Sequence, residues 1–145
     1  MNNFEYGAIT TVRAAIPGDK GNLLLVHRHV RHDNNANLWE MPGGKINDPA
    51  EPPEVALKRR VLEETGLEIK VMSPLRTVER RTMRDPAMYD QFYIVHTALA
   101  HIIGGELRLG ESHDEAGWQP HNQPIKLPLT LAASVAISFY NLDKF

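Results

Sequence analysis

The stretch "EMPGGKINDPAEPPEVALKRRVLEETGL" (residues 40–67) joins a glycine turn to two adjacent prolines and a charged run that ends in two glutamates. Pro52 and Pro53 can begin a helix, because proline's missing N–H falls among the donors that a first turn leaves unpaired. Gly66 stands where a left-handed residue commonly ends a helix. We therefore expect a helix over residues 53–65, directly after the glycine turn.

One face of this expected helix carries four charged side chains within roughly 140° of arc, namely Arg59, Arg60, Glu63 and Glu64. Apolar residues flank this strip, with Leu57 and Val61 on one side and Val55 and Leu62 on the other. We expect both flanks to pack against neighbours, so that the charged strip borders a groove. The alternative is a surface helix with Arg–Glu pairs four residues apart, each contributing only about 0.2–0.5 kcal/mol.

Length and composition indicate one globular domain. The 145 residues suffice for one domain with its own core and are too few for two ordinary ones. Hydrophobic residues make up 42% and charged residues 23% of the chain, close to the average of globular proteins. The formal charge of −2 argues against a general polyanion-binding surface, so we expect no scaffold role on nucleic acid.

The sequence also argues against secreted and membrane-spanning classes. It contains no cysteine, which excludes disulfides, thiolate catalysis and Cys-ligated zinc. Its first residues lack the basic stretch and apolar core of a secretion signal. The longest apolar stretch, residues 127–140, is too short and too rich in Ser and Thr to span a bilayer. We therefore expect a cytoplasmic protein with no membrane partner.

The remaining patterns predict strands on both sides of the helix and a second helix near the end. The expected strands cover residues 8–16, 23–28, 67–72, 74–82 and 91–100, the first two as neighbours across a turn. Residues 104–118 read as a turn leading to a strand and then a polar loop, and residues 129–141 as a helix. This order favours an α/β sandwich with a mixed sheet between helices over a doubly wound parallel sheet.

The glycine turn and the helix together resemble a known motif. Gly44, Glu51, Arg59, Val61, Glu63, Glu64, Gly66 and Leu67, preceded by "WEMPGGK", resemble the Nudix box, G-x5-E-x7-R-E-U-x-E-E-x-G-U with U aliphatic. The resemblance implies a single Nudix domain over residues 1–145 with an α/β/α sandwich fold. It also implies a MutT-like, divalent-metal-dependent pyrophosphohydrolase acting on a nucleoside diphosphate linked to another moiety.

The sequence departs from the Nudix pattern at two places. Six residues rather than five separate Gly44 from Glu51, which we expect to bulge the turn only. Arg60 stands where the pattern has a glutamate. A guanidinium about 4 Å from a bound cation opposes its binding by ~4 kcal/mol at an effective dielectric near 20. Arg60 could instead pair with Glu64, or bind a substrate phosphate and replace part of the metal's role.

The resemblance assigns roles to several residues around this departure. It implies that Glu63 and Glu64 bind Mg²⁺ or Mn²⁺, that Arg59 orients these carboxylates, and that Glu51 holds Arg59. Gly43, Gly44 and Lys45, with Arg60, would form the substrate-binding loop. A downstream acid would complete the metal site; Glu115 is our first choice and Glu111 our second, against the alternative of exposed loop acids.

Arg60 also leaves a second function open. A catalytically impaired Nudix-fold domain could bind a nucleotide or regulate another process without cleaving the ligand, and an interaction module with no ligand would leave the glycine loop unexplained. In the leading hypothesis the partner is a small-molecule nucleotide or other diphosphate substrate. The sequence leaves the substrate undetermined and is compatible with a homodimer.

Overall fold

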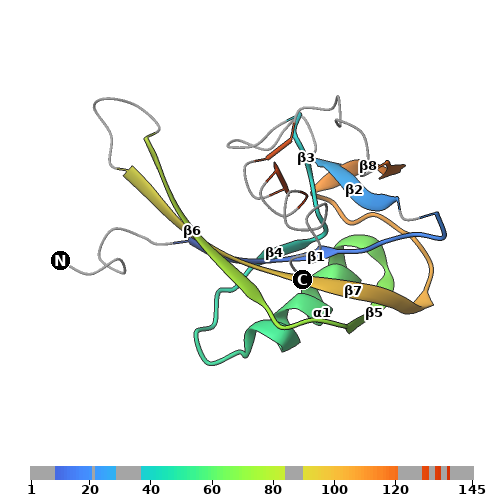
Figure 1. The fold of residues 1–145 in the computed structure, drawn as a ribbon, viewed down its shortest axis with the longest axis horizontal. Coiled ribbons are helices and arrows are strands. Elements are labelled where there is room, and N and C mark those ends of the chain that lie inside the picture. The colour runs from blue at the N-terminus through green and yellow to red at the C-terminus, as the bar shows by residue number, and fades with distance from the viewer. Residues whose placement is uncertain are drawn as a thin grey trace.

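The computed structural model describes residues 9–20, 22–28, 37–83, 90–120, 129–130, 133–134 and 137, with the backbone alone for residues 78–83 and 90–93. One long strand, β7 (Asp90–Gly105), organises the larger sheet (Figure 1). It pairs in parallel with β1 (Ile9–Ala15) and antiparallel with β6 (Arg76–Met83) and β5 (Leu67–Val71). A short strand, β4 (Gly43–Lys45), pairs antiparallel with β1 and brings the glycine turn to the edge of this sheet.

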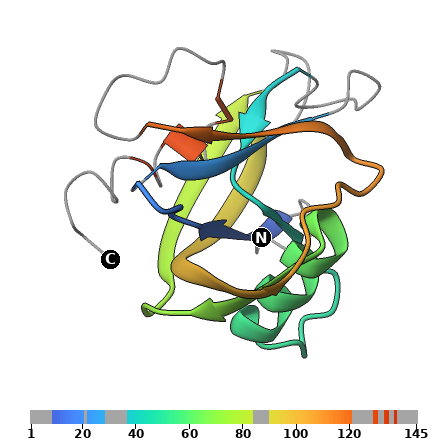
Figure 2. The same ribbon diagram turned by 90° about the vertical axis from the view of Figure 1, so that its right-hand side faces the viewer.

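A smaller antiparallel sheet lies beside the larger one. Its strands are β3 (Trp39–Glu40), β2 (Leu23–Arg28) and β8 (His113–Gln119), in the order β3-β2-β8. A register shift after His27 leaves Arg28 opposite His113. Figure 2 shows β2 and β8 above the level of the helix α1, with strands of the larger sheet between. The α/β class with a mixed sheet, predicted from the sequence, is confirmed.

The helix α1 (Pro53–Thr65) has the bounds that the sequence predicts. Pro52 precedes it in an extended conformation, and Gly66 ends it at φ 74°, donating its N–H to the Leu62 carbonyl at 2.9 Å. Glycine adopts this left-handed conformation without the steric cost of a Cβ, which is why the helix stops here. The helix packs against β5, β4 and β1.

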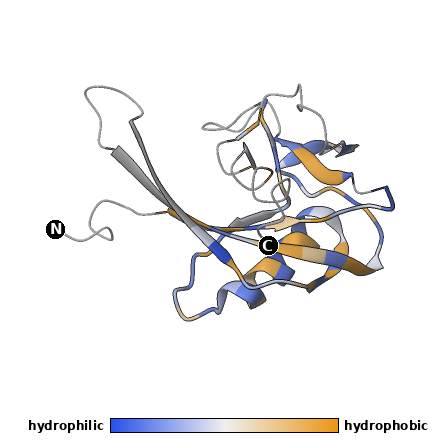
Figure 3. Cartoon of the chain, in the orientation of Figure 1, coloured by the Kyte–Doolittle hydropathy of each residue, from blue (hydrophilic) through white to orange (hydrophobic). Residues whose placement is uncertain are grey.

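The expectation that both apolar flanks of α1 are buried is wrong for one flank. Leu57 and Val61 are fully buried, whereas Val55 and Leu62 are 52% and 48% exposed. The larger sheet covers only one side of the helix, so the second flank faces solvent. Figure 3 shows the hydrophobic part of β7 that passes beside α1.

Two apolar clusters hold the layers together. The first core joins α1 to the larger sheet and to Leu24 of the smaller sheet; it includes Val12, Ile16, Leu24, Ala56, Leu57, Val61, Leu67, Ile69, Ala98 and Ala100. The second core contains Ala15, Leu23, Leu25, Trp39, Met41, Ala133 and Ile137. Ala133, Ser134 and Ile137 are helical, in line with the expected helix over residues 129–141, most of which lies outside the described residues.

The structure corrects two sequence expectations about strands. The strands β1 and β2 are not paired with each other but belong to different sheets; the Pro17–Leu23 bridge and the hydrogen bond from the Leu24 N–H to the Ile16 carbonyl join the segment that follows β1 to β2. The stretch 104–118, expected to be a turn, a strand and then a polar loop, has no strand over residues 106–112, and its polar end belongs to β8. Backbone pairing with β2 holds this edge strand, so its outward polar side chains need no apolar alternation.

Within the part of the chain that the structure describes, no helix combines the length and the apolar character that crossing a membrane requires.

Candidate functional site

Arg59 lies at the centre of a hydrogen-bonded clamp on α1. Its Nε and one terminal nitrogen donate to the two Glu51 carboxylate oxygens at 2.8 and 2.7 Å, and the other terminal nitrogen donates to Glu63 Oε1 at 3.0 Å. The hydrogen bond from Arg59 lowers the pKa of Glu51. The predicted holding of Arg59 by Glu51 is therefore present in the structure, and Arg59 in turn fixes one oxygen of Glu63.

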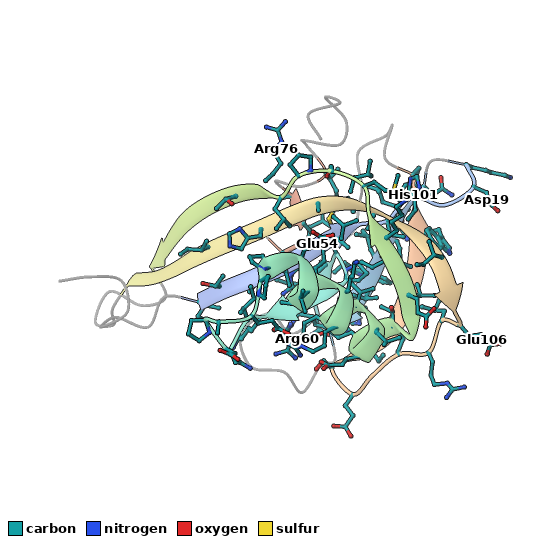
Figure 4. The ribbon with its side chains drawn as sticks, turned by 90° about the horizontal axis from the view of Figure 1, so that it is seen from below. Asp19, Glu54, Arg60, Arg76, His101 and Glu106 are labelled. Atoms are coloured by element: carbon teal, nitrogen blue, oxygen red, sulfur yellow. The ribbon has the colours of Figure 1, made fainter. Side chains whose placement is uncertain are left out.

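Arg60 lies across the glycine turn. Its Nε donates to the Lys45 carbonyl at 2.8 Å, and its NH1 lies 3.4 Å from Glu63 Oε2. Of the two sequence alternatives, a pair with Glu64 is replaced by this pair with Glu63. Figure 4 labels Arg60 and Glu54 on different sides of α1. Both carboxylate oxygens of Glu63 therefore face arginines.

The two glycines of the turn make room for this arrangement. Gly43 has φ 151°, and a Cβ there would lie 1.9 Å from the Val12 carbonyl oxygen. A Cβ on Gly44 would lie 2.9 Å from Cδ and 3.1 Å from Nε of Arg60. Any side chain at Gly43 would collide with β1, and any side chain at Gly44 would push against Arg60. The substrate-binding role of Gly43, Gly44 and Lys45 stays a prediction.

Glu64 differs from Glu63 in its surroundings. Its side chain is only 17% exposed, and its Oε2 has no hydrogen-bond partner among the described residues. The His113 Nδ1 lies 3.6 Å from this oxygen. Burial raises the pKa of Glu64, and the charges of Arg13 and His113 offset part of that rise. A buried carboxylate oxygen without a donor is a ready position for a cation.

Behind Glu64 the structure reveals a buried ionic cluster that the sequence analysis missed. Glu40, whose side chain is 2% exposed, lies 3.3 Å from an Arg13 nitrogen, 3.1 Å from an Arg28 nitrogen and 3.0 Å from the His113 Nε2. Burial alone would raise the pKa of Glu40, but Arg13, the hydrogen bond from His113 and Arg28 together lower it to about 2. Glu40 is therefore ionised at neutral pH.

The ionised Glu40 determines which nitrogen of His113 bears a proton. A carboxylate can only accept hydrogen bonds, so the His113 Nε2 carries a hydrogen and donates it to Glu40. The other ring nitrogen, Nδ1, is buried without a hydrogen-bond partner among the described residues and faces the Glu64 Oε2. His113 thus connects the buried cluster to the carboxylate at the end of α1.

A sequence signal for Glu40 existed. Trp39 and Met41 both belong to the second core, so the alternation of an extended segment places Glu40 on the opposite face, toward α1. For His113 we find no comparable signal, because its neighbours in β8 are polar.

The structure separates the two candidate downstream acids. Glu115 pairs in register with His27, whose ring centroid lies 5.1 Å from that of Trp39 on the second-core side of the smaller sheet. Directly paired residues point to the same side of a sheet, so Glu115 points away from α1. Glu111 follows Gly110, whose N–H donates to the Glu64 carbonyl at 3.0 Å. The metal-binding role of Glu115 stays a prediction, and the backbone brings Glu111 closer to Glu64.

The described residues contain no ready-made group of three or more His, Asp or Glu side chains that could hold a metal ion. The predicted set of Glu63, Glu64 and Glu115 is thus not gathered at one point. The Glu64 Oε2 nevertheless fits a hard divalent cation, because it is a carboxylate oxygen that lies buried without a hydrogen-bond donor.

Comparisons with known proteins find a matching family model and similar sequences. The family model described as "NUDIX domain" matches residues 8–140. The chain is 31% identical over 123 residues to the CTP pyrophosphohydrolase of Escherichia coli (strain K12), covering 83% of each chain. It is 28% identical over 118 residues to the ADP-ribose pyrophosphatase of Mycobacterium tuberculosis (strain H37Rv), covering 80% of this chain and 53% of that protein.

Solved structures show the same likeness. The crystal structure of the MutT NUDIX hydrolase from Burkholderia pseudomallei aligns with a TM-score of 0.75 at 32% identity, over 90% of this chain and 96% of that one. A MutT protein from Methanosarcina mazei aligns with the same TM-score of 0.75 at 22% identity, over 94% of this chain and 95% of that chain, which supports the fold alone. The chain spans 53%, 59% and 61% of the length of three curated relatives.

Proposed function

The chain belongs to the Nudix family, and from this membership we propose that it is a divalent-metal-dependent pyrophosphohydrolase acting on a nucleoside diphosphate linked to another moiety. Residues 1–145 would form one Nudix domain, with Glu63 and Glu64 as ligands of Mg²⁺ or Mn²⁺. The observation that carries this proposal is the Glu64 Oε2, a buried carboxylate oxygen that lacks a hydrogen-bond donor among the described residues.

The side chains around Glu64 divide the work of the proposed site. A divalent cation bound there would neutralise charge on phosphate oxygens and lower the pKa of a bound water. Arg59 holds Glu63 in place through its hydrogen bond to Oε1, and Glu51 holds Arg59 from the opposite side. Arg59 is therefore a positioning residue, whose effect on hydrolysis passes through Glu63.

The glycine turn would bind the phosphate chain of the substrate. Gly43 and Gly44 carry no side chain where the backbone passes β1 and Arg60, so a substrate can approach the backbone closely. Lys45 is exposed and adds a positive charge beside the turn. Glu111, rather than Glu115, is the acid that we now favour to complete the site, since the adjacent Gly110 is bonded to the end of α1.

The relatives support a nucleotide as the substrate class. They include an ADP-ribose pyrophosphatase, a CTP pyrophosphohydrolase and an 8-oxo-dGTP diphosphatase. These names share cleavage of a phosphoanhydride in a nucleotide but differ in the group beyond it. We therefore propose the linkage and leave the choice among these substrates to the assay. A cytoplasmic location, and the choice between a monomer and a homodimer, stay predictions from the sequence.

The test is hydrolysis by purified protein with Mg²⁺ or Mn²⁺ and a panel of ADP-ribose, CTP and 8-oxo-dGTP. We expect turnover of at least one compound, and a loss of about 10³-fold or more in Glu64→Gln, because that change removes a charged ligand of the cation. Glu54→Gln is the matched control, since Glu54 is exposed and contacts Lys58 only at 3.9 Å. Binding of a nucleotide without turnover would instead support the impaired, ligand-binding alternative.

A further inference from the structure

Arg60 places a permanent positive charge among the glutamate side chains at the end of α1. Its guanidinium is held at two points, by the Lys45 carbonyl at 2.8 Å and by Glu63 Oε2 at 3.4 Å, and its side chain is 22% exposed. Gly44 lets the Arg60 Cδ and Nε lie flat against the turn. The charge is thus fixed in position beside the glycine turn rather than carried on a freely moving side chain.

The charges on this face suit one divalent cation rather than two. Glu51, Glu63 and Glu64 supply three negative charges, and Arg59 and Arg60 supply two positive ones, which leaves a net charge of −1. A glutamate at position 60 would change this balance by two units, the charge of one divalent cation. The arginine therefore supplies locally part of the positive charge that a second cation would bring.

The hydrogen bonds also indicate a single bound cation. Both oxygens of Glu63 are engaged, Oε1 by Arg59 at 3.0 Å and Oε2 by Arg60 at 3.4 Å. Glu64 Oε2 lacks a partner among the described residues, and behind it the fully buried His113 Nδ1 also lacks one. The carboxylate oxygen that is open to a cation therefore belongs to Glu64, which lies next to Arg60 on the charged face of α1.

We propose that Arg60 takes the place of a second divalent cation: the site binds one cation, at Glu64, and the Arg60 guanidinium binds a phosphate group of the substrate. A guanidinium can donate two parallel hydrogen bonds to a phosphate, which a lysine ammonium cannot reproduce. This inference rests on the proposed function, because it names the way in which that same site neutralises the phosphate chain.

The experiment counts Mn²⁺ ions bound to the purified full chain, by electron paramagnetic resonance and calorimetry, without substrate. We expect one Mn²⁺ per wild-type chain, two in Arg60→Glu and none at this site in Glu64→Gln. Arg60→Lys keeps the charge and should still bind one. Glu54→Gln, outside the site, is the control and should match the wild type.

A second readout tests the phosphate contact. With one saturating metal concentration, Arg60→Lys should raise KM about 10-fold or more for the best substrate and change kcat less, since binding of phosphate is lost before chemistry. Circular dichroism of each variant identifies any that fail to fold, and Arg60→Gln then replaces a failed variant.

The outcomes separate this inference from the proposed function. Two Mn²⁺ ions in the wild type, or one in a folded Arg60→Glu, would overturn the substitution of Arg60 for a cation and leave the hydrolase proposal intact. An unchanged KM in both Arg60→Lys and Arg60→Gln would overturn the phosphate contact. No Mn²⁺ on the wild type, or full binding by Glu64→Gln, would overturn the proposed metal site itself.

Discussion

Glu40 and Glu64 lie on opposite sides of the same imidazole, yet the pKa values of these two buried carboxylates shift in opposite directions. Glu40 lies among Arg13, Arg28 and the His113 Nε2, and its pKa is lowered to about 2. Glu64 has one oxygen without a partner among the described residues, and burial raises its pKa. The first carboxylate is neutralised by the protein itself, whereas the second awaits a positive charge from outside.

This difference distinguishes a structural carboxylate from a functional one. A buried charge is tolerated where hydrogen bonds and opposite charges replace the lost water. Glu40 meets that condition and ties two sheets together, since Arg13 lies in β1 and Arg28 in β2. Glu64 does not meet it, and such uncompensated groups concentrate at functional sites. The comparison therefore predicts that neutralising each glutamate changes stability in opposite directions.

The largest expected effect on stability is that of Glu40→Gln. The change leaves Arg13 and Arg28 partly buried without their counter-charge, so we expect the free energy of unfolding to fall by about 3–5 kcal/mol. Urea unfolding at pH 7 measures it. Glu54→Gln is the matched exposed control and should stay within about 0.5 kcal/mol of the wild type. If Glu40→Gln lowered the free energy of unfolding by less than about 1 kcal/mol, Glu40 could not be called a structural carboxylate in contrast to Glu64.

The pH dependence of stability should come next in size. Because the pKa of Glu40 in the folded state, about 2, lies below its ordinary value of 4.5, its contribution is complete above pH 4.5 and is lost as the pH falls to 2. We expect the stability gap between the wild type and Glu40→Gln to narrow by about 3 kcal/mol over this range. Unfolding curves of both proteins at successive pH values measure the gap, and parallel curves would contradict the low pKa.

The elements around these carboxylates were largely predictable from local sequence. The bounds of α1 follow from Pro52 and Gly66, whose backbone preferences act within a single turn. The strand β2 was predicted with its observed bounds because an apolar run followed a clear turn. Local patterns failed at β8, where pairing with β2, nearly ninety positions earlier in the chain, holds a segment of polar composition.

The candidate site was only half predictable for the same reason. Glu63 and Glu64 stand next to each other in a recognisable motif, so the sequence was enough to single them out. Glu40 and His113 meet across 73 positions, and their contact depends on how two sheets pack. One of the two partners of Arg60 is the backbone carbonyl of Lys45, which no side-chain pattern marks.

Glu64→Gln has the smallest expected effect on stability, and it is the most direct test of the difference between Glu40 and Glu64. Since its pKa is raised, Glu64 favours the fold below its ordinary pKa of 4.5, and this contribution is lost as the pH rises through its folded pKa. At pH 7.5 in EDTA, Glu64→Gln should therefore stabilise the protein by about 1 kcal/mol, a rise in Tm of about 2–5 °C. Differential scanning calorimetry measures this shift.

Adding Mg²⁺ should reverse the order, because a cation bound to the folded wild type stabilises it while Glu64→Gln lacks the ligand. In the wild type the uncompensated carboxylate then lowers the stability of the metal-free protein and is also the group that binds the cation. Stability and function therefore make opposite demands on this residue. If Glu64→Gln instead destabilised the protein in EDTA as Glu40→Gln does, Glu64 would belong to the ionic cluster of the fold. The metal would then have to bind elsewhere on the helix. Glu63 would become the carboxylate to test, once its ion pair with Arg60 is broken.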